Sequence, residues 1–410
     1  MTDTTSHPHD PGGVLVLNSG SSSIKYRLFD VADRVRADGL VERIGESGAR
    51  AVHHTMDPDT EVVEDEPLAD HAAGFASIVA ALERAGLADG LGAIGHRVVH
   101  GGAEFSAPTR IDDQVVARIR AQIPLAPLHN PANLTGIEVA RTLRGDLPQV
   151  AVFDTAFHAT LPEHAYRYAI DRDIADANGI RRYGFHGTSH AYVARRAAEH
   201  LGRPLEELKL ITCHLGNGAS VTAIDGGRSV ETSMGLSPLE GLVMGTRSGD
   251  LDPAVVFHLI REAGMDVDEV DVLLNRNSGL KGLCGENDVR TIETRAAAGD
   301  ERAAGALAIH AHRIRRYLGA YTAILGRLDA VVFTAGVGEN ADTVRARVCA
   351  DLEVLGIVLD EDANRGARAG ASTDGVLALQ APTSSVAVLA IATDEESEIA
   401  AQTRQALAAG

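Results

Sequence analysis

The sequence has few cysteines, no tryptophan and no long hydrophobic run. Its three cysteines, Cys213, Cys284 and Cys349, are too few and too widely spaced for a disulfide framework or a zinc knot, which suits a reducing cytoplasm. No window reaches the roughly 18 consecutive apolar residues of a membrane span. Residues 1–13 are polar and lack the apolar core of a signal peptide. We therefore expect a disordered tail there, in a cytoplasmic protein that does not contact a membrane.

Positive charge is also scarce, because 38 Lys and Arg stand against 57 Asp and Glu, for a formal net charge of −19. Such an acidic chain lacks the broad basic surface that nucleic acid requires, so we exclude nucleic acid as a partner. An anionic ligand would need a locally basic pocket. The 410 residues, 45% of them hydrophobic, are more than one core usually holds. This predicts two domains with a cleft between them.

Two strand–turn–strand patterns stand about half the chain apart. Residues 14–29 alternate between apolar and polar around a turn rich in serine, and residues 210–224 repeat the pattern around a turn rich in glycine. Helical periodicity appears at residues 75–82 and 314–325. The alternation of strands and helices predicts an α/β fold. The pattern alone leaves an internal duplication and two unrelated hairpins equally open.

Three turns rich in glycine or serine follow predicted strands, at residues 18–23, 216–220 and 335–340. We expect the last to be a loop that precedes a helix. Such turns can point backbone N–H groups at phosphate oxygens. None matches a P-loop or a dinucleotide fingerprint, and each alone is more often an ordinary turn. Together they favour a bound nucleotide.

Arginine and histidine gather in glycine-containing segments at residues 95–102, 183–190 and 244–250. Taken singly, Arg97 or Arg247 is more typical of a surface ion pair. Glycine permits close backbone approach, however, and arginine in such loops of an acidic protein favours anion binding.

The histidines allow a second interpretation. His96 and His100 stand four residues apart, as do His186 and His190, a spacing that places two imidazoles on one helical face for a structural zinc or a binuclear hydrolase centre. The glycines between them disfavour a regular helix, so this is the minor alternative.

Seven longer segments occur in a fixed order along nearly the whole chain: 18–25, 95–102, 127–131, 153–158, 182–190, 214–218 and 245–250. Together they resemble the acetate kinase family, within the superfamily of actin, Hsp70 and sugar kinases. The resemblance implies an α/β fold with two ribonuclease-H-like (actin-like ATPase) domains flanking a cleft. It implies an N-terminal domain from residues 14–155 with 395–410, and a C-terminal nucleotide-binding and dimerisation domain from residues 156–394.

The resemblance further implies reversible, direct in-line transfer of a phosphoryl group between ATP and acetate, giving ADP and acetyl phosphate. It implies dependence on Mg²⁺, with Mn²⁺ as an alternative, and a homodimer. The nearest alternative is a propionate or butyrate kinase of the same superfamily. A non-catalytic, actin-like ATP-binding assembly protein is a further one.

Roles carry over to residues that match the family's motifs. Arg97 and Arg247 would hold the carboxylate and the transferring phosphoryl group, and His186 would stabilise the transition state. His129 and Asp154 match further catalytic positions, and Asn18 and Glu395 would hold the metal. The apolar pocket for the methyl group would comprise Val99, Leu128, Phe185 and Pro238. The nucleotide would contact Ser21, Ser23, Lys25, His214, Leu215, Gly216, Asn217, Gly218, Asn287, Asp288, Val289, Arg290, Gly336, Val337, Gly338, Glu339 and Asn340.

The sequence departs from the family's usual Thr-Asn-Glu-Glu at Thr393-Asp394-Glu395-Glu396. Asp394 adds a negative charge beside the expected metal carboxylate. We expect Thr393 to cap the last helix, because Glu396 stands three residues later as in a capping box, and Asp394 is the alternative cap.

Overall fold

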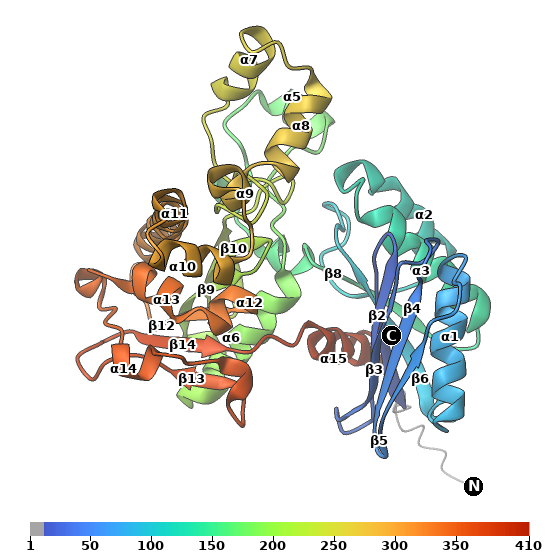
Figure 1. Ribbon diagram of the computed structural model, residues 1–410. Helices are drawn as coiled ribbons and strands as arrows, with labels where there is room; N and C mark the ends of the chain where they lie inside the picture. The colour runs from blue at the N-terminus through green and yellow to red at the C-terminus, as the bar shows by residue number, and fades with distance from the viewer. Residues whose placement is uncertain (1–11, 410) are drawn as a thin grey trace, which may run out of the picture. The chain divides into compact units, whose positions relative to one another are not determined.

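The computed structural model describes residues 12–409, and within them the chain divides into two compact units (Figure 1). The first unit contains residues 12–156 and 394–409, and the second contains residues 157–393. The tail expected at residues 1–13 lies outside the described residues except for Gly12 and Gly13, and Gly13 already begins the first strand. Of the helices in residues 12–409, none has both the length and the apolar character of a membrane span.

The first unit is built on an eight-stranded sheet in the order β5-β4-β3-β2-β1-β6-β8-β7. Its strands are β1 (Gly13–Ser19), β2 (Ser23–Phe29), β3 (Val35–Glu42), β4 (Arg50–Met56), β5 (Asp59–Glu64), β6 (Leu91–Val98), β7 (Thr109–Arg110) and β8 (Gln149–Phe153). Its longer helices are α1 (His71–Arg84), α2 (Asp113–Ala121), α3 (Asn130–Leu143) and α15 (Glu395–Ala408). Strands β1, β6 and β8 run parallel, whereas β2 and β3 run antiparallel to their neighbours.

Strand β1 is apolar throughout because both of its faces are covered. Leu15 and Leu17 belong to the core cluster that includes residues of α1 and α3, whereas Val14 and Val16 cluster with residues of α15. Successive side chains of a strand point to opposite faces, so the run 14–17 needs no polar residue. Gly95 on β6 lets α15 pack closely, since a Cβ there would lie 2.4 Å from the Thr403 hydroxyl oxygen.

The second unit has a six-stranded sheet in the order β11-β10-β9-β12-β14-β13. Its strands are β9 (Lys209–Leu215), β10 (Ala219–Asp225), β11 (Arg228–Thr232), β12 (Ala330–Thr334), β13 (Val376–Ala378) and β14 (Ala387–Ile391). Its helices are α4 (Glu163–Tyr166), α5 (Arg172–Ala177), α6 (Gly187–Leu201), α7 (Ala254–Arg261), α8 (Val267–Arg276), α9 (Gly279–Cys284), α10 (Val289–Ala297), α11 (Glu301–Leu325), α12 (Ala335–Asn340), α13 (Asp342–Cys349) and α14 (Glu361–Asn364). Helix α6 packs on β9 and β12, and α11 contacts β9 and β10.

The two sheets repeat one topology. The order β3-β2-β1-β6-β8 in the first unit corresponds to β11-β10-β9-β12-β14 in the second, with the same strand directions. This confirms the predicted α/β class of two ribonuclease-H-like domains. It also favours duplication over two unrelated hairpins, because each hairpin occupies the same place in its sheet.

Two local expectations were wrong. Residues 335–340 form helix α12 rather than a loop, and the unusual angle falls on Ala335, with φ +63°, instead of on a glycine. Glycine at 187 does not prevent a helix either, because α6 begins there. Helix α12 follows the fully buried strand β12, and both α12 and α6 pack on β9 and β12. These tertiary contacts outweigh the cost of placing glycine in a helix, which is about 1 kcal/mol per glycine.

Candidate active site

Parallel strands bring three of the predicted residues of the first unit to one edge of the sheet. Asn18 and Arg97 lie near the carboxyl ends of β1 and β6, and Asp154 directly follows β8. Because these strands are parallel neighbours, their carboxyl ends meet, which is where α/β proteins bind ligands.

Arg97 is fixed by two carboxylates. Its Nε and Nη2 donate to the Asp154 carboxylate at 3.0 and 2.7 Å, and Nη2 lies 3.4 Å from Glu395 Oε2. Burial disfavours the guanidinium charge, but Asp154 and Glu395 outweigh burial and raise the pKa of Arg97. Asp154 is only 2% exposed, so this bidentate pair fixes the orientation of Arg97. The Arg97 Nη1 group makes no hydrogen bond with another described residue, which leaves one edge of the guanidinium for a ligand.

The first turn of α15 carries a second set of ion pairs. Lys25 Nζ lies 2.5 Å from Glu396, and Arg27 Nη1 donates to Asp394 at 2.9 Å. Asp394, not Thr393, is the N-cap, because its side chain accepts a hydrogen bond from the Ser397 N–H at 2.9 Å. The extra negative charge of Asp394 is therefore balanced by Arg27 and by the start of the helix.

The hairpin between β1 and β2 closes through a hydrogen bond from Gly20 N to Ser23 O at 2.8 Å. Ser21 at its tip is exposed and Ser23 is partly buried. The Asn18 side chain is partly buried and makes no hydrogen bond with any residue in the range 12–409. Asn18 and Glu395 therefore offer one amide oxygen and one carboxylate, which are ligand types that Mg²⁺ accepts.

The zinc alternative has no support in the described part of the chain, where no three His, Cys, Asp or Glu side chains could hold a metal ion. His96 lies in a strand, and its Nε2 is 2.8 Å from Gln149 Oε1. Burial lowers its pKa to about 4. His190 is fully buried and is hydrogen-bonded to Thr212 and Ser220. These two imidazoles are therefore buried side chains that hydrogen-bond within the protein core.

The remaining predicted residues of the first unit lie around the start of α3. The backbone N–H of Val99 donates to Asn133 on α3 at 3.0 Å, and His129 occupies the N-cap position of that helix. Val99 is partly buried, and Leu128 is 60% exposed although it is apolar. Leu128 thus presents an apolar surface that nothing in its own unit covers.

In the second unit, His186 and His214 stack with ring centroids 4.0 Å apart. His186 precedes α6 in a left-handed conformation, φ +57°, which a residue other than glycine rarely adopts and which often marks a functional position. Its Nδ1 is hydrogen-bonded to Ser220 Oγ at 2.9 Å, and His214 Nδ1 is hydrogen-bonded to Ser189 Oγ at 2.8 Å. Two hydroxyl groups that sequence reasoning missed therefore orient the imidazoles.

Arg247 lies beside His186 without an acidic partner. A Cβ on Gly218 would lie 3.4 Å from Arg247 Nη1 and 3.5 Å from His186 Nε2, so both groups line one small space. Arg247 Nη1 donates to the Pro238 carbonyl at 3.2 Å, but no carboxylate in the described chain forms an ion pair with it. Burial lowers its pKa, and no carboxylate offsets this effect. Arg247 is a partly buried cation that lacks a counter-ion.

Glycine also lets the segment of Arg247 approach the turn after β9. Gly245 N donates to Asn217 O at 2.9 Å, and a Cβ at Gly245 would lie 2.0 Å from Asn217 Oδ1. Any larger residue would push the two segments apart, which explains glycine at this position.

A cavity of about 760 Å³ joins three of the predicted nucleotide segments. Predicted residues that line it are Gly216, Asn217, Asn287, Asp288, Val289, Arg290, Gly336, Val337 and Asn340. Its size suits a small-molecule ligand. Sequence reasoning missed the other lining residues, Leu280, Glu293, His310, Ala341, Asp342 and Arg368. They carry no local motif, so only the packing of helices α9 to α13 and of the segment that follows α14 could identify them.

Other predicted residues of the second unit lie outside the cavity lining. Leu215 and Phe185 are buried, at 0% and 2% exposure. Glu339 accepts a hydrogen bond from Thr393 N at 2.9 Å, and burial raises its pKa. Gly338 is buried in α12, where its carbonyl accepts a hydrogen bond from Arg345 at 2.8 Å. Leu215, Gly338 and Glu339 therefore stabilise the segments around residues 215–218 and 335–340. Pro238 positions Arg247 through its carbonyl oxygen.

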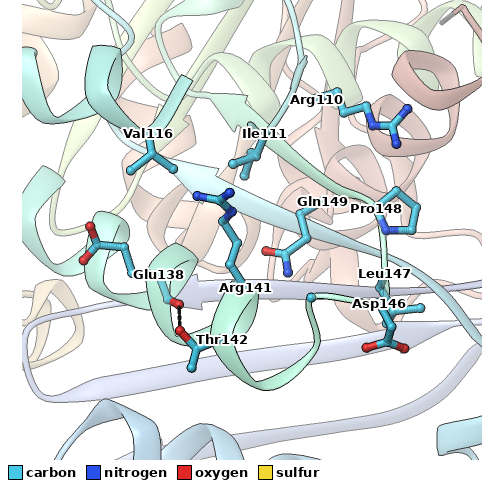
Figure 2. A pocket seen from close by; sticks show the side chains of 11 residues that line it. Arg110, Ile111, Val116, Glu138, Arg141, Thr142, Asp146, Leu147, Pro148 and Gln149 are labelled. Atoms are coloured by element: carbon cyan, nitrogen blue, oxygen red, sulfur yellow. Dashed lines mark hydrogen bonds between the residues drawn. The ribbon is translucent and has the colours of Figure 1, made fainter. Parts of the chain in front are cut away.

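The first unit has a cavity of its own, of about 680 Å³, at the opposite end of β8 from Asp154 (Figure 2). Figure 2 shows Arg141 extending between Ile111 and Val116. Three of the cavity's four charged lining residues form ion pairs with neighbours outside the lining: Arg141 with Asp113 at 2.6 Å, Asp146 with Arg144 at 2.9 Å, and Glu138 with Arg120. None of the predicted site residues lines this cavity.

Comparisons with known proteins identify the family of this chain. The model of the acetokinase family matches residues 13–401. Acetate kinase from Streptomyces avermitilis is 58% identical over 397 residues, which cover 96% of this chain and 97% of that protein. Acetate kinase from Streptomyces griseus is 59% identical over 404 residues, 96% of each chain.

Solved structures give the same result. The crystal structure of Porphyromonas gingivalis acetate kinase superposes with a TM-score of 0.90 at 43% identity, covering 97% of this chain and 100% of that one. A propionate kinase from Francisella tularensis has a TM-score of 0.89 at 39% identity, covering 96% and 99%. The chain therefore belongs to the acetokinase family.

Proposed function

We propose that this protein is a magnesium-dependent acetate kinase that transfers the γ-phosphoryl group of ATP to acetate, reversibly and in line. A carboxylate oxygen of acetate forms the new bond to phosphorus, and the bond to the β-phosphate oxygen breaks as ADP leaves. The observation that carries the proposal is Arg247, a partly buried cation without a carboxylate partner, beside His186 and the turn that leads into the nucleotide cavity.

The reaction needs cations more than it needs a base. Carboxylic acids titrate near pKa 4, so acetate is already ionised at neutral pH. Bringing two unit charges to about 4 Å costs on the order of 4 kcal/mol at an effective dielectric near 20, and the γ-phosphate carries more than one charge. A cation without a counter-ion, such as Arg247, offsets this repulsion, and a bidentate guanidinium suits the equatorial oxygens.

His186 and Arg97 would act differently. The hydrogen bond to Ser220 fixes the His186 ring, and Nε2, on the side of Gly218 and Arg247, would donate to the transferring phosphoryl group. Arg97 is held by Asp154, so Asp154 would be a positioning residue, and the Nη1 edge of Arg97 would bind the carboxylate. We assign His129 to binding of the acetate carboxylate, together with Arg97. Recognition of the methyl group is assigned to Val99, Leu128, Phe185 and Pro238.

Magnesium, or manganese in its place, would be held by Asn18 and Glu395. Two protein ligands would suffice, because proteins usually hold Mg²⁺ through one or two side chains and not through a full protein cage. The ion would neutralise charge that develops on the phosphates. Lys25 would join Ser21 and Ser23 in contacting the phosphates once it exchanges its ion pair with Glu396. We further propose that ATP and ADP occupy the cavity of the second unit, and that the enzyme is cytoplasmic, where thiols such as its three buried cysteines stay reduced.

A propionate kinase is the second candidate, since one solved relative has that title. The assembly-protein alternative is disfavoured, because ATP binding alone does not require Arg247 to lack a counter-ion. Acetate-dependent formation of a hydroxamate from acetyl phosphate, with ATP and magnesium, tests the proposed function directly.

We also propose a homodimer. Helix α7 has no buried residue, and Phe257 and Val255 on it are 54% and 41% exposed. On the adjoining α8, Val267 and Val272 are 70% and 42% exposed. Exposed apolar residues that gather on adjoining helices are typical of a subunit interface.

Removing Arg247 tests its role. Arg247→Ala should lower turnover by about 10³ to 10⁵, as the loss of an arginine finger does, because the phosphoryl charge then lacks its partner. ADP affinity measured by calorimetry should stay within a few fold. Arg302→Ala, which alters an exposed arginine of α11, is the control and should retain full turnover. A tenth of normal turnover in Arg247→Ala would rule out this role.

Acid size tests the methyl pocket. Val99→Ala should raise kcat/KM for propionate relative to acetate, because one methylene in an apolar site is worth about 1 to 3 kcal/mol. Val79→Ala on α1 is the matched control. An unchanged ratio in Val99→Ala would remove Val99 from the pocket. A wild-type preference for propionate or butyrate over acetate would support the second candidate instead.

Filling the cavity tests nucleotide binding. No atom would lie within 4 Å of a Cβ at Gly336, so Gly336→Leu should fold, and its side chain should occupy the cavity. We expect ADP to bind about tenfold more weakly or worse, because the leucine excludes the ligand sterically. Gly305→Leu is the control, since Gly305 is equally unobstructed but lies away from the cavity. Equal ADP affinities in the two variants would place the nucleotide elsewhere.

Charge at the exposed face of α7 tests the dimer. Wild-type protein should have twice the chain mass by light scattering. Phe257→Glu should shift it toward the monomer, because a buried, unpaired carboxylate costs several kcal/mol. Ile324→Glu on α11 changes an equally exposed apolar residue, 54% exposed, and should remain dimeric. A dimeric Phe257→Glu variant would argue against this interface, and a monomeric wild type against the homodimer.

A further inference from the structure

A second basic site lies on the second unit, and none of the residues to which a role is assigned above lines it. It is a groove of about 600 Å³ between α11 and the end of α13, which we call the basic groove. Its charged lining comprises His312, Arg315 and Arg316 on α11 and Arg347 on α13. Residues three or four apart share a helical face, so His312 and the two following arginines lie along one side of α11.

None of these four side chains forms a hydrogen bond or an ion pair with another residue between 12 and 409. The contrast with Arg313, on the same helix, is clear: it donates to the carbonyls of Gly241 and Asp250 at 3.1 and 3.0 Å. Asp351 lies near in the sequence but forms no ion pair with the groove arginines. In a chain of net charge −19, three unpaired arginines around one groove form a local positive site.

The chemistry of the lining defines the ligand. The rest of the groove is alanine and leucine, including Ala311 and Leu352, and it offers no side-chain acceptor. All of the polar side chains are therefore donors and are cationic or can become so. Arginine binds phosphate bidentately, and three arginines from two helices match more than one anionic group. A groove of this volume takes a small molecule.

The basic groove and the nucleotide cavity share their walls. On α11, His310 lines the cavity and the next residue, Ala311, lines the groove. On α13, Asp342 lines the cavity and Arg347 lines the groove. Helices α11 and α13 pack against each other, so a ligand that draws Arg315 and Arg347 together acts on the same helix pair that shapes the cavity.

We propose that the basic groove binds a small molecule with two or more phosphate groups, and that this binding changes nucleotide affinity at the cavity. The proposed change in nucleotide affinity rests on the proposed function, whereas the proposed binding at the basic groove does not. Coupling between two such sites is reciprocal and typically amounts to about 5- to 150-fold in affinity.

Calorimetry with tripolyphosphate tests binding. Saturating ADP keeps the probe from the nucleotide cavity, and sodium sulfate at matched ionic strength controls for screening. Wild type should bind, and Arg315→Gln with Arg347→Gln should bind at least about tenfold more weakly, since two bidentate partners are lost. The control Arg302→Gln should bind as wild type does. Arg316→Gln with Arg347→Gln, which alters only exposed side chains, is the second variant in case the first pair misfolds.

Undiminished tripolyphosphate binding in the groove variants, or none in wild type, would overturn the groove as a site. Pyrophosphate and a sugar bisphosphate, used as parallel probes, distinguish inorganic from organic sources of the same chemistry. ADP affinity, measured with and without tripolyphosphate, should shift at least about fivefold in wild type and not in the groove variants. An unchanged ADP affinity would overturn the coupling. Failure of ADP to bind at all would count against the proposed function, and the groove measurement made without ADP would still stand.

Discussion

A strand that runs parallel to its neighbours must end at the same edge as they do, and this constraint governs both units. In the first unit it brings together the ends of β1, β6 and β8, and in the second those of β9, β12 and β14. Residues separated by more than a hundred positions, such as Asn18 and Asp154, therefore reach one edge without any long loop. The antiparallel hairpin at the start of each sheet adds a turn to the same edge.

The two arginines assigned to catalysis represent different solutions to one electrostatic problem. Arg97 is held by Asp154 and Glu395, so its position is certain but much of its charge is already offset. Arg247 has carbonyl and sulfur contacts only, so its charge remains available. Partial burial of an uncompensated cation costs stability. Such a residue is therefore expected where an anionic ligand completes the interaction, whereas a purely structural arginine would have a carboxylate.

The sequence predicted those features of the fold and of the site that depend on neighbouring residues in the chain. Strand–turn–strand patterns and the glycine-containing segments are local, and they predicted the α/β class and two of the turns that line the nucleotide cavity, at residues 216–217 and 336–340. Residues 287–290 of the lining followed only from the resemblance to the family. The helical state of residues 335–340 is not local, since their glycines favour a loop and the packing of α12 on β9 and β12 decides otherwise. The N-cap was misplaced by one residue because Thr393 and Asp394 are both good caps, and the ion pair with Arg27 selects Asp394.

Other features are relations between distant residues and carry no sequence signal. Ser189 and Ser220 orient two imidazoles, and nothing around either serine predicts it. The lack of a partner at Arg247 is a property of its surroundings, which only a folded structure defines.

The same reasoning separates the cavity at the start of β8 from the basic groove, both of which have arginine in their lining. At the start of β8, Arg141 pairs with Asp113, and the lining carboxylates Glu138 and Asp146 pair with Arg120 and Arg144. Arg110 is the one charged residue of that lining without an ion pair within residues 12–409, so most of the charge there is already offset. Between α11 and α13 the arginines have no carboxylate partner among the described residues, although acidic residues outnumber basic ones along the chain. Surface ion pairs contribute little to stability, about 0 to 1 kcal/mol each, so stability alone does not explain either arrangement. What differs is the free charge left for a ligand, and by that measure the basic groove resembles the surroundings of Arg247 more than it resembles an ordinary acidic surface.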